Sequence, residues 1–435
     1  MTILKNIRLG LLHVAVAITF VAINGVLNRI MIADLGILST IVAALIILPY
    51  VLSPAQVWLG AYSDQHPIFG YRRSPYILLG MILCFGGMVL TPYAATELAV
   101  GFWNGLPLGV LAFGLWGVGY NLAVVSYLSL ASDLSEEHQR SRTIAVMWFM
   151  MIASIIASAI IIGSLLEPYS QEQLIRVFFG AAGVGLALTA IGLVGLEPRL
   201  SEVEIEKRDT HQETIAAVIN NPQARIFFIY LVLMLCAILG QDVLLEPYGA
   251  QTFGMTVEET TQLTALWGGT TLVALLTYGF VLTRFMSKKT GAMLGGAIAT
   301  VGLVLIALAG TAPNMAVVFQ PGIAILGFGT GIATSTNLAL MLDMTTAAQA
   351  GLFIGAWGVA DAASRGVGMM LGGIVRDIVG GISGDATLGY ITVFLIEAGF
   401  LLLSLALLTQ INTAEFQGRK RRAPTMLEVA AISGD

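Results

Sequence analysis

Long apolar runs alternate with short polar segments along almost the whole chain. Each run has about 20 residues or more, which is enough for a helix to cross the hydrocarbon core of a bilayer. The pattern predicts an all-α membrane protein with twelve transmembrane helices, over residues 8–31, 38–60, 75–95, 104–131, 143–165, 174–196, 225–246, 260–283, 290–311, 315–342, 350–380 and 388–410. The eleventh run is long enough for its helix to be tilted or broken.

The composition excludes an ordinary soluble globular protein. Hydrophobic residues make up 57% of the 435 residues and charged residues 11%, whereas soluble domains carry about 25% charged residues. Both cysteines, Cys84 and Cys236, fall inside predicted spans. We therefore expect them to be small packing residues and not a disulfide.

The basic residues are distributed unevenly between the two sides of the predicted membrane. Most of the 21 Lys and Arg residues fall in alternate loops, on the side that also holds the N-terminus. Because positively charged loops resist translocation, this asymmetry predicts that both termini are cytoplasmic. The opening MTILKNIRLG runs directly into a span too long for the core of a cleavable signal peptide, so none is expected.

Two stretches of the chain repeat each other. GVGYNLAVVSYLSLASD, from Gly117 to Asp133, aligns without a gap to GFGTGIATSTNLALMLD, from Gly327 to Asp343. A second match, near the start of each half, pairs Asn24 with Gln241. The repeats predict two pseudo-symmetric halves of six transmembrane helices each.

The expected organisation has four parts. They are an N-terminal six-helix half over residues 1–196, a cytoplasmic linker over 197–224, a C-terminal six-helix half over 225–411 and a cytoplasmic tail over 412–435. Two parallel halves joined in this way are the plan of the major facilitator superfamily. The basic run at Gly418 to Arg422 is placed either to touch anionic lipid headgroups or to act only as a topology anchor.

The loop between the second and third spans, GAYSDQHPIFGYRR, resembles a signature that the superfamily keeps at this place. Gly60, Asp64, Gly70, Arg72 and Arg73 fill its Gly-x-x-x-Asp and Gly-x-Arg-Arg positions, with several extra residues between the two parts. The resemblance implies a cytoplasmic latch in which the Asp faces the Arg residues and holds the two halves. The alternative is a simple positive-inside topology signal.

Two motifs together resemble one branch of the superfamily. SDQHPIFGYRRSPYI, from Ser63 to Ile77, and DVLLEPYGAQTFGMTVEETTQLTALWGG, from Asp242 to Gly269, are similar to the PucC-type family of bacteriochlorophyll and chlorophyll delivery proteins. The resemblance extends over nearly all of the chain. It implies that chlorophyll or bacteriochlorophyll is the cargo, that antenna polypeptides and pigment-synthesis enzymes are partners, and that the protein sits in a photosynthetic membrane.

A chlorophyll needs an apolar groove, an axial ligand for its magnesium and hydrogen-bond donors for its ring carbonyls. On the first span His13, Asn24 and Asn28 fall within about 60° of one another at roughly 100° per residue. His13 can supply an axial nitrogen or donate to a neighbouring helix. Asn24 and Asn28 can bind a ring carbonyl or join helices to each other.

The seventh span offers a second group of candidates, Gln241, Asp242 and Glu246, near its predicted outer end. Asp242 and Glu246 are four residues apart, and two like charges on one helix face repel unless one is protonated or a cation lies near. We expect Arg29, the pseudo-equivalent of Glu246, to pair with Glu246 or Asp242 and to close the outer mouth. A role in pigment binding is the alternative.

Two later spans also carry charged residues. Asp361 and Arg365 are one helical turn apart on the eleventh span, and the cost of a charge in the membrane predicts that they pair. Glu397 on the twelfth span has no partner evident in the sequence, so a protonated carboxyl bonded to a neighbour is expected.

Three functions compete on this evidence. The first is a pigment-carrying assembly factor for light-harvesting apoproteins, the second a secondary transporter of an amphipathic solute and the third a pigment-free scaffold. No phosphate-binding loop, metal-binding cysteine pair or nucleophile–base pair is present in the sequence, so we expect neither an enzyme, nor a directly bound metal, nor a nucleic-acid partner. The sparse polar lining of the spans favours the first function over the second.

Overall fold

The computed structural model describes residues 3–135, 140–199, 222–343 and 350–411. Most of the predicted linker, the basic run at Gly418 to Arg422 and the rest of the predicted tail lie outside these residues. Within the described part of the chain, eleven helices are long and apolar enough to cross a membrane. The chain is therefore an all-α integral membrane protein, as its apolar pattern predicts.

The first six predicted spans correspond to the helices α1 (Ile3–Phe20) with η1 (Val21–Leu27) and η2 (Ile30–Asp34), α2 (Ser39–Ile46) with α3 (Leu48–Val51) and α4 (Ala55–Gln65), α5 (Ser74–Val100), α6 (Phe102–Leu134), α7 (Arg140–Leu165) and α8 (Gln171–Leu193). The second predicted span is not among the eleven long helices, because α2, α3 and α4 are each too short to cross a membrane. Pro49 and Pro54 lie at the starts of α3 and α4, where the missing backbone N–H of proline does the least harm to a helix.

The last six predicted spans correspond to α10 (Pro222–Gly240) with η4 (Gln241–Val243) and α11 (Leu245–Phe253), α12 (Val257–Phe280) with η5 (Leu282–Arg284), α13 (Lys288–Ala309), η6 (Pro313–Val318) with α14 (Phe319–Asp343), α15 (Ala350–Ser383) and α16 (Ala386–Gln410). Gly254 ends α11 in the left-handed conformation, with φ of 68°. A capping box of Thr256 and Glu259 then begins α12.

Equivalent glycines pack equivalent helices in the two halves. A Cβ atom on Gly80 or Gly119 would lie within 2.6 Å of the backbone of the facing helix in the α5–α6 pair. Gly295 and Gly329 make the same close approach in the α13–α14 pair. Gly119 and Gly329 occupy matching places in the sequence repeat. The repeat therefore corresponds to the same close packing of two helices in each half.

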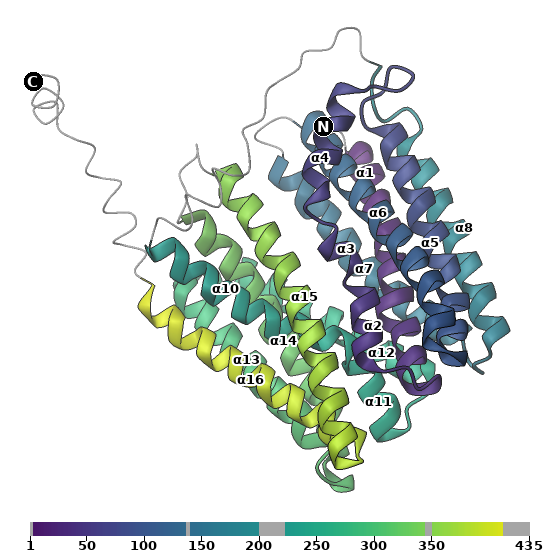
Figure 1. The fold of residues 1–435 in the computed structure, drawn as a ribbon. Coiled ribbons are helices and arrows are strands. Elements are labelled where there is room, and N and C mark those ends of the chain that lie inside the picture. Colours follow the sequence, from purple (N-terminus) through teal and green to yellow (C-terminus); the bar gives the residue numbers. More distant parts are fainter. Residues whose placement is uncertain (1–2, 136–139, 200–221, 344–349, 412–435) are drawn as a thin grey trace, which may run out of the picture.

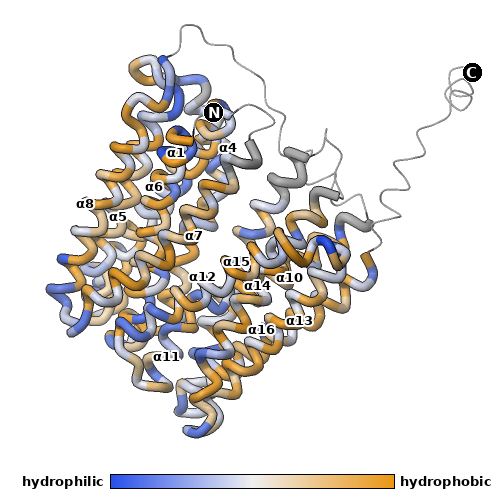
Figure 2. Tube along the Cα trace, turned by 180° about the vertical axis from the view of Figure 1, so that it is seen from behind, coloured by the Kyte–Doolittle hydropathy of each residue, from blue (hydrophilic) through white to orange (hydrophobic). Residues whose placement is uncertain are grey.

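The two halves form two separate groups of helices (Figure 1). They pack against each other through α7 with α12 and through α2 with α15. In Figures 1 and 2 the ribbons meet at one end, the joined end, and separate toward the other, the diverging end, where the N-terminus lies. Figure 2 shows hydrophobic residues along the middle of the helices and hydrophilic ones mainly at the helix ends.

At the joined end, α15 caps a helix of the other half. The Asp377 carboxylate accepts hydrogen bonds from the backbone N–H groups of Ser39 and Thr40, at 3.2 and 2.8 Å, and from the Thr40 hydroxyl at 2.8 Å. These N–H groups belong to the first turn of α2 and have no partner within that helix. Gly373 lies beside them, because a Cβ there would come within 2.9 Å of the Ser39 carbonyl oxygen.

We expect Asp377→Ala to loosen the joined end. Each of the three lost hydrogen bonds contributes about 0.5–1.5 kcal/mol, so the opening equilibrium should shift by at least ~10-fold. The measurement is the rate at which a thiol-reactive reagent labels a cysteine introduced at Ile37, which is buried at this end. Asp385→Ala is the matched control, because Asp385 caps α16 within its own half. Equal labelling rates in the two variants would contradict the capping role.

Candidate functional site

The first span changes its helical winding where its polar residues lie. After Phe20 the α-helix becomes π-helical over Val21–Leu27 and again over Ile30–Asp34. Wide helical turns of this kind are rare and often occur at functional sites. Because the winding changes, the predicted stripe of His13, Asn24 and Asn28 at 100° per residue is not kept, and the three side chains have different neighbours.

His13 lies in α1 among aromatic side chains of the first half. Its ring centroid is 5.2 Å from that of Tyr127 in α6 and 5.8 Å from that of Trp148 in α7. His13 is buried, and its Nδ1 has no hydrogen-bond partner among the described residues. Trp148 is 51% exposed, so this member of the aromatic group reaches the surface of the protein. Neither aromatic residue was among the candidates, since sequence spacing does not connect them to His13.

The two asparagines have different partners, and one of them contacts the second half. Asn24 donates only to the Phe20 carbonyl oxygen of its own helix, at 3.2 Å. Asn28 donates to the Val243 carbonyl oxygen, 2.8 Å away across the interface between the halves. The carbonyl oxygens of both side-chain amides lack a partner among the described residues. Asn28, which directly follows the π-helical segment η1 of the first half, therefore joins it to the 3₁₀ turn η4 of the second.

A cluster of three charged side chains lies on the second half at the same interface. The Arg365 guanidinium is 3.2 Å from Asp361, one turn before it on α15, and 3.2 Å from Asp242 on η4. The predicted Asp361–Arg365 pair is thus formed and extended by a second carboxylate. On its other side Arg365 lies over the ring of Tyr50, 5.5 Å from its centroid. Tyr50 comes from α3 of the first half, so a cation–π contact crosses the interface.

The predicted pair of Arg29 with Glu246 or Asp242 is wrong. Arg29 forms an ion pair with Asp34 of its own half and donates to the Met255 carbonyl oxygen at 3.1 Å. Asp242 forms an ion pair with Arg365 instead. The physical reason is that Asp34 ends the π-helical segment that directly follows Arg29, which places a carboxylate of the same span within reach of the guanidinium.

Glu246 has different neighbours from those expected. It accepts a hydrogen bond from the Thr264 hydroxyl, and a Cβ on Gly25 would lie 2.8 Å from its Oε1. Its other oxygen has no partner among the described residues. Gln241, on η4, donates to Oδ1 of the neighbouring Asp242 at 2.8 Å. Of the six pigment-binding candidates, four therefore lie where the first and seventh spans meet: Asn28, Gln241, Asp242 and Glu246.

The residues of the predicted latch hold the first half together. Arg73 is buried, with its Nη1 2.8 Å from the Ser63 hydroxyl and its Nε 3.4 Å from Asp133. The backbone N–H groups of Arg72 and Arg73 both donate to the Glu197 carboxylate.

The predicted latch also included Asp64, whose side chain lies outside the described residues. The contacts of Arg72 and Arg73 with Ser63, Asp133 and Glu197 lie within the first half and the start of the predicted linker. The helices of the two halves diverge at this end (Figure 1). The latch between Asp64 and the two arginines stays a prediction.

Comparisons with known proteins agree with this architecture. Residues 26–416 match the family described as PUCC protein. Protein PucC of Cereibacter sphaeroides is 33% identical over 430 residues, which cover 96% of this chain and 94% of that protein. The bacteriochlorophyll synthase 44.5 kDa chain of Rhodobacter capsulatus is 29% identical over 393 residues, which cover 88% of this chain and 90% of that one.

A solved structure shares the fold. It is a bacterial homolog of the human lysosomal transporter Spinster, in an inward-facing and unoccupied conformation. The TM-score is 0.73, the match covers 98% of this chain and 100% of that one, and the sequence identity is 13%. A match at such low sequence identity is evidence for a shared fold alone. The chain therefore has the fold of the major facilitator superfamily.

We expect Arg365→Met to destabilise the protein by about 3 kcal/mol, because two carboxylates then lose their cation in a mostly apolar environment. The triple variant Asp242→Asn, Asp361→Asn, Arg365→Met should recover most of that loss, since it leaves no charge behind. Unfolding of the purified protein in detergent measures both effects.

The matched control is Arg176→Met, which breaks an exposed pair with Glu172 worth at most about 0.5 kcal/mol. If the triple variant were no more stable than Arg365→Met alone, the destabilisation would not come from stranded charge.

Proposed function

The chain belongs to the PucC family, and on this premise we propose that it is an assembly factor that carries chlorophyll or bacteriochlorophyll to light-harvesting apoproteins. A role in the assembly of photosynthetic pigments or complexes rests on the family and on the relatives named above. Delivery to antenna polypeptides is the finer step. The proposal also places the protein in a photosynthetic membrane with both termini on the cytoplasmic side. It assigns the protein no catalytic activity.

The observation that carries the pigment proposal is the surroundings of His13. A neutral imidazole is a good metal ligand, and Nδ1 of His13 has no hydrogen-bond partner among the described residues. Tyr127 and Trp148 offer aromatic rings at 5.2 and 5.8 Å for contact with a flat macrocycle. The bound pigment would supply the magnesium ion, which takes His13 as its axial ligand.

Hydrogen bonds to the ring carbonyls would come from the same half of the protein. Asn24 uses its amide N–H group only on its own helix, at 3.2 Å, which is a weak bond that a ligand can replace. Asn28 is less suited, because its bond to Val243 at 2.8 Å also holds the two halves together. Among the candidates, His13 is therefore the preferred pigment ligand, Asn24 is the asparagine whose amide is more readily available, and the residues of the seventh span have structural roles.

A pigment with a long hydrocarbon tail has no need of a water-filled path. Large hydrophobic side chains are exposed all along the helices, among them Trp148 and Phe149 on α7. Such surfaces suit contact with lipid, with the tail of the cargo or with the apolar helix of an antenna polypeptide. We propose that the cargo enters and leaves sideways, from and to the lipid phase.

The test is the absorption spectrum of the protein purified in mild detergent from cells that make pigment. We expect a red absorption band that elutes with the protein at constant stoichiometry and is lost in His13→Ala, because the axial ligand is removed. The matched control is His66→Ala, since His66 is exposed at the end of α4 and stacks on Tyr62. His66→Ala should keep the band.

Other outcomes point elsewhere. A band that survives in His13→Ala would place the pigment at another site. A colourless protein that still co-purifies with antenna polypeptides would support a scaffold without pigment.

Secondary transport is a second candidate, and one observation favours it. The halves are joined at one end and diverge at the other, with the Arg365 cluster at the interface between them (Figure 1). Solute transporters of this fold bind substrate between the halves near the middle of the membrane. A colourless protein without antenna partners, which moves an amphipathic solute across vesicles, would support this alternative.

A further inference from the structure

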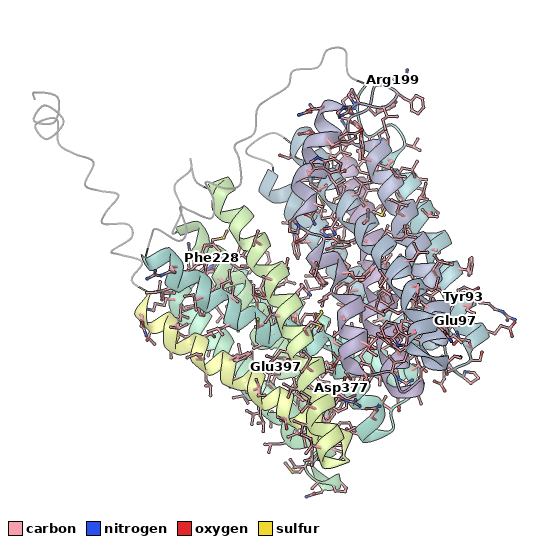
Figure 3. All side chains as sticks on the ribbon, in the orientation of Figure 1. Tyr93, Glu97, Arg199, Phe228, Asp377 and Glu397 are labelled. Atoms are coloured by element: carbon pink, nitrogen blue, oxygen red, sulfur yellow. The ribbon has the colours of Figure 1, made fainter. Side chains whose placement is uncertain are left out.

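Glu397 on α16 is a buried carboxyl group that the proposed function does not use. It is 2% exposed, and neither of its oxygens has a hydrogen-bond partner among the described residues. Figure 3 labels it in the middle part of the C-terminal half, away from the helix ends. An ionised carboxylate without a partner is strongly unfavourable in such surroundings. The packing therefore accommodates the protonated, neutral acid.

Two glycines make the space that the carboxyl occupies. A Cβ on Gly240, the last residue of α10, would lie 2.7 Å from Glu397 Oε1 and 3.3 Å from the Cα of Gly368 on α15. A Cβ on Gly368 would come within 2.6 Å of the Cys236 carbonyl oxygen. The acid thus sits where α10 and α15 approach most closely, directly before α10 gives way to η4.

The groups around Glu397 offer it no counter-charge at contact distance. From α10 the titratable neighbour is Cys236, and from η4 it is Asp242, which interacts with Glu397 unfavourably. The remaining titratable or charged groups of the packed elements are Arg225 and Tyr230 on α10, Asp361, Arg365, Arg376 and Asp377 on α15, Glu246 and Tyr248 on α11, and Lys288 and Lys289 at the start of α13. Arg365, the cation that lies near the broken part of the seventh span, is shared between Asp361 and Asp242.

A short path of contacts connects this acid to the interface between the halves. Gly240 leads directly into η4, whose Asp242 holds Arg365 at 3.2 Å. Arg365 in turn lies over Tyr50 of the first half. A negative charge on Glu397 repels the Asp242 carboxylate. Asp242 lies on η4, the same turn whose Val243 carbonyl oxygen accepts the hydrogen bond from Asn28, so the repulsion acts on a contact between the halves.

The fold itself does not require an acid at this place. The sequence VFFGAAG at Val177 to Gly183 in the sixth span matches VFLIEAG at Val393 to Gly399 in the twelfth, so Ala181 is the counterpart of Glu397. The first half packs with an alanine in the equivalent position. A buried acid that is costly and not needed for packing points to a function.

We propose that Glu397 is a proton-binding site, and that its protonation is coupled to the relative arrangement of the two halves. A proton from water bonds to one carboxyl oxygen, and the same bond breaks when the proton returns to water. The ligand is a proton and not a metal ion, because a cation of that kind needs several oxygen ligands and the described residues contain no group of three His, Cys, Asp or Glu side chains that could hold one. The inference does not depend on pigment binding.

The experiment uses the full chain, purified and reconstituted in lipid discs, with two readouts. The first is the infrared band of a protonated carboxyl group at neutral pH. The second is the distance between spin labels at Trp58→Cys on α4 and Val359→Cys on α15, both exposed positions, between about pH 5 and pH 9, where buried carboxyl groups titrate. The native Cys84 and Cys236 are buried and should stay unlabelled.

We expect Glu397→Gln, which keeps the size and neutrality of the protonated acid, to fold normally and to lose the infrared band. In the spin-labelled protein that keeps Glu397, the distribution of distances between the two labels should shift with pH. This shift should disappear when Glu397→Gln is added. Glu97→Gln, at an exposed acid, is the matched control and should change neither readout.

Three results would overturn the proposal. They are an infrared band that is unchanged in Glu397→Gln, a band that is lost in Asp242→Asn and kept in Glu397→Gln, and a pH-dependent distance that is the same with and without Glu397. The second result would move the proton to Asp242. Loss of pigment binding in these variants would be a separate matter, because neither readout requires pigment.

Discussion

Hydrogen bonding of the backbone in an apolar environment is the constraint on which the rest of this structure depends. No water is present in the hydrocarbon core to satisfy a free N–H or C=O group, so each interruption of a helix must find a partner within the protein. The first, second and seventh spans of this protein are interrupted. Asn28 bonds to the Val243 carbonyl oxygen, and Asp377 caps the first turn of α2. The interrupted helices meet at the interface between the halves because there they satisfy one another.

Charges follow a different rule from the backbone groups. Arg365 is neutralised by Asp242 and Asp361 of its own half, and Arg29 pairs with Asp34 of its own half. Across the interface, charged side chains contact uncharged groups, such as backbone groups, the Thr40 hydroxyl and the ring of Tyr50. The halves can therefore separate without leaving an unpaired charge in the membrane, which is the costliest event in such an environment. This division suits a protein whose two halves move.

The site residues show which interactions are local enough to be predicted. The Asp361–Arg365 pair follows from a spacing of one helical turn, and the structure forms it. The pairing of Arg29 with Glu246 or Asp242 relied on pseudo-symmetry across the interface, and the π-helical segment offered Arg29 a nearer carboxylate in Asp34. Likewise the predicted stripe of His13, Asn24 and Asn28 assumed a regular α-helix. Sequence periodicity gives no sign of a π-helical turn, so both errors have one cause.

The sequence by itself determined the class of protein, the positions of the membrane spans and the two-fold repeat, because these depend on hydrophobic run length and on local identity. It also singled out the few polar residues within the spans. Only the tertiary structure decided their partners: Tyr127 and Trp148 beside His13, Asp242 added to the Arg365 pair and Asp377 on the end of α2. These contacts join residues far apart in the chain. Their geometry depends on how two halves and three interrupted helices fit together, and no local pattern in the sequence encodes that fit.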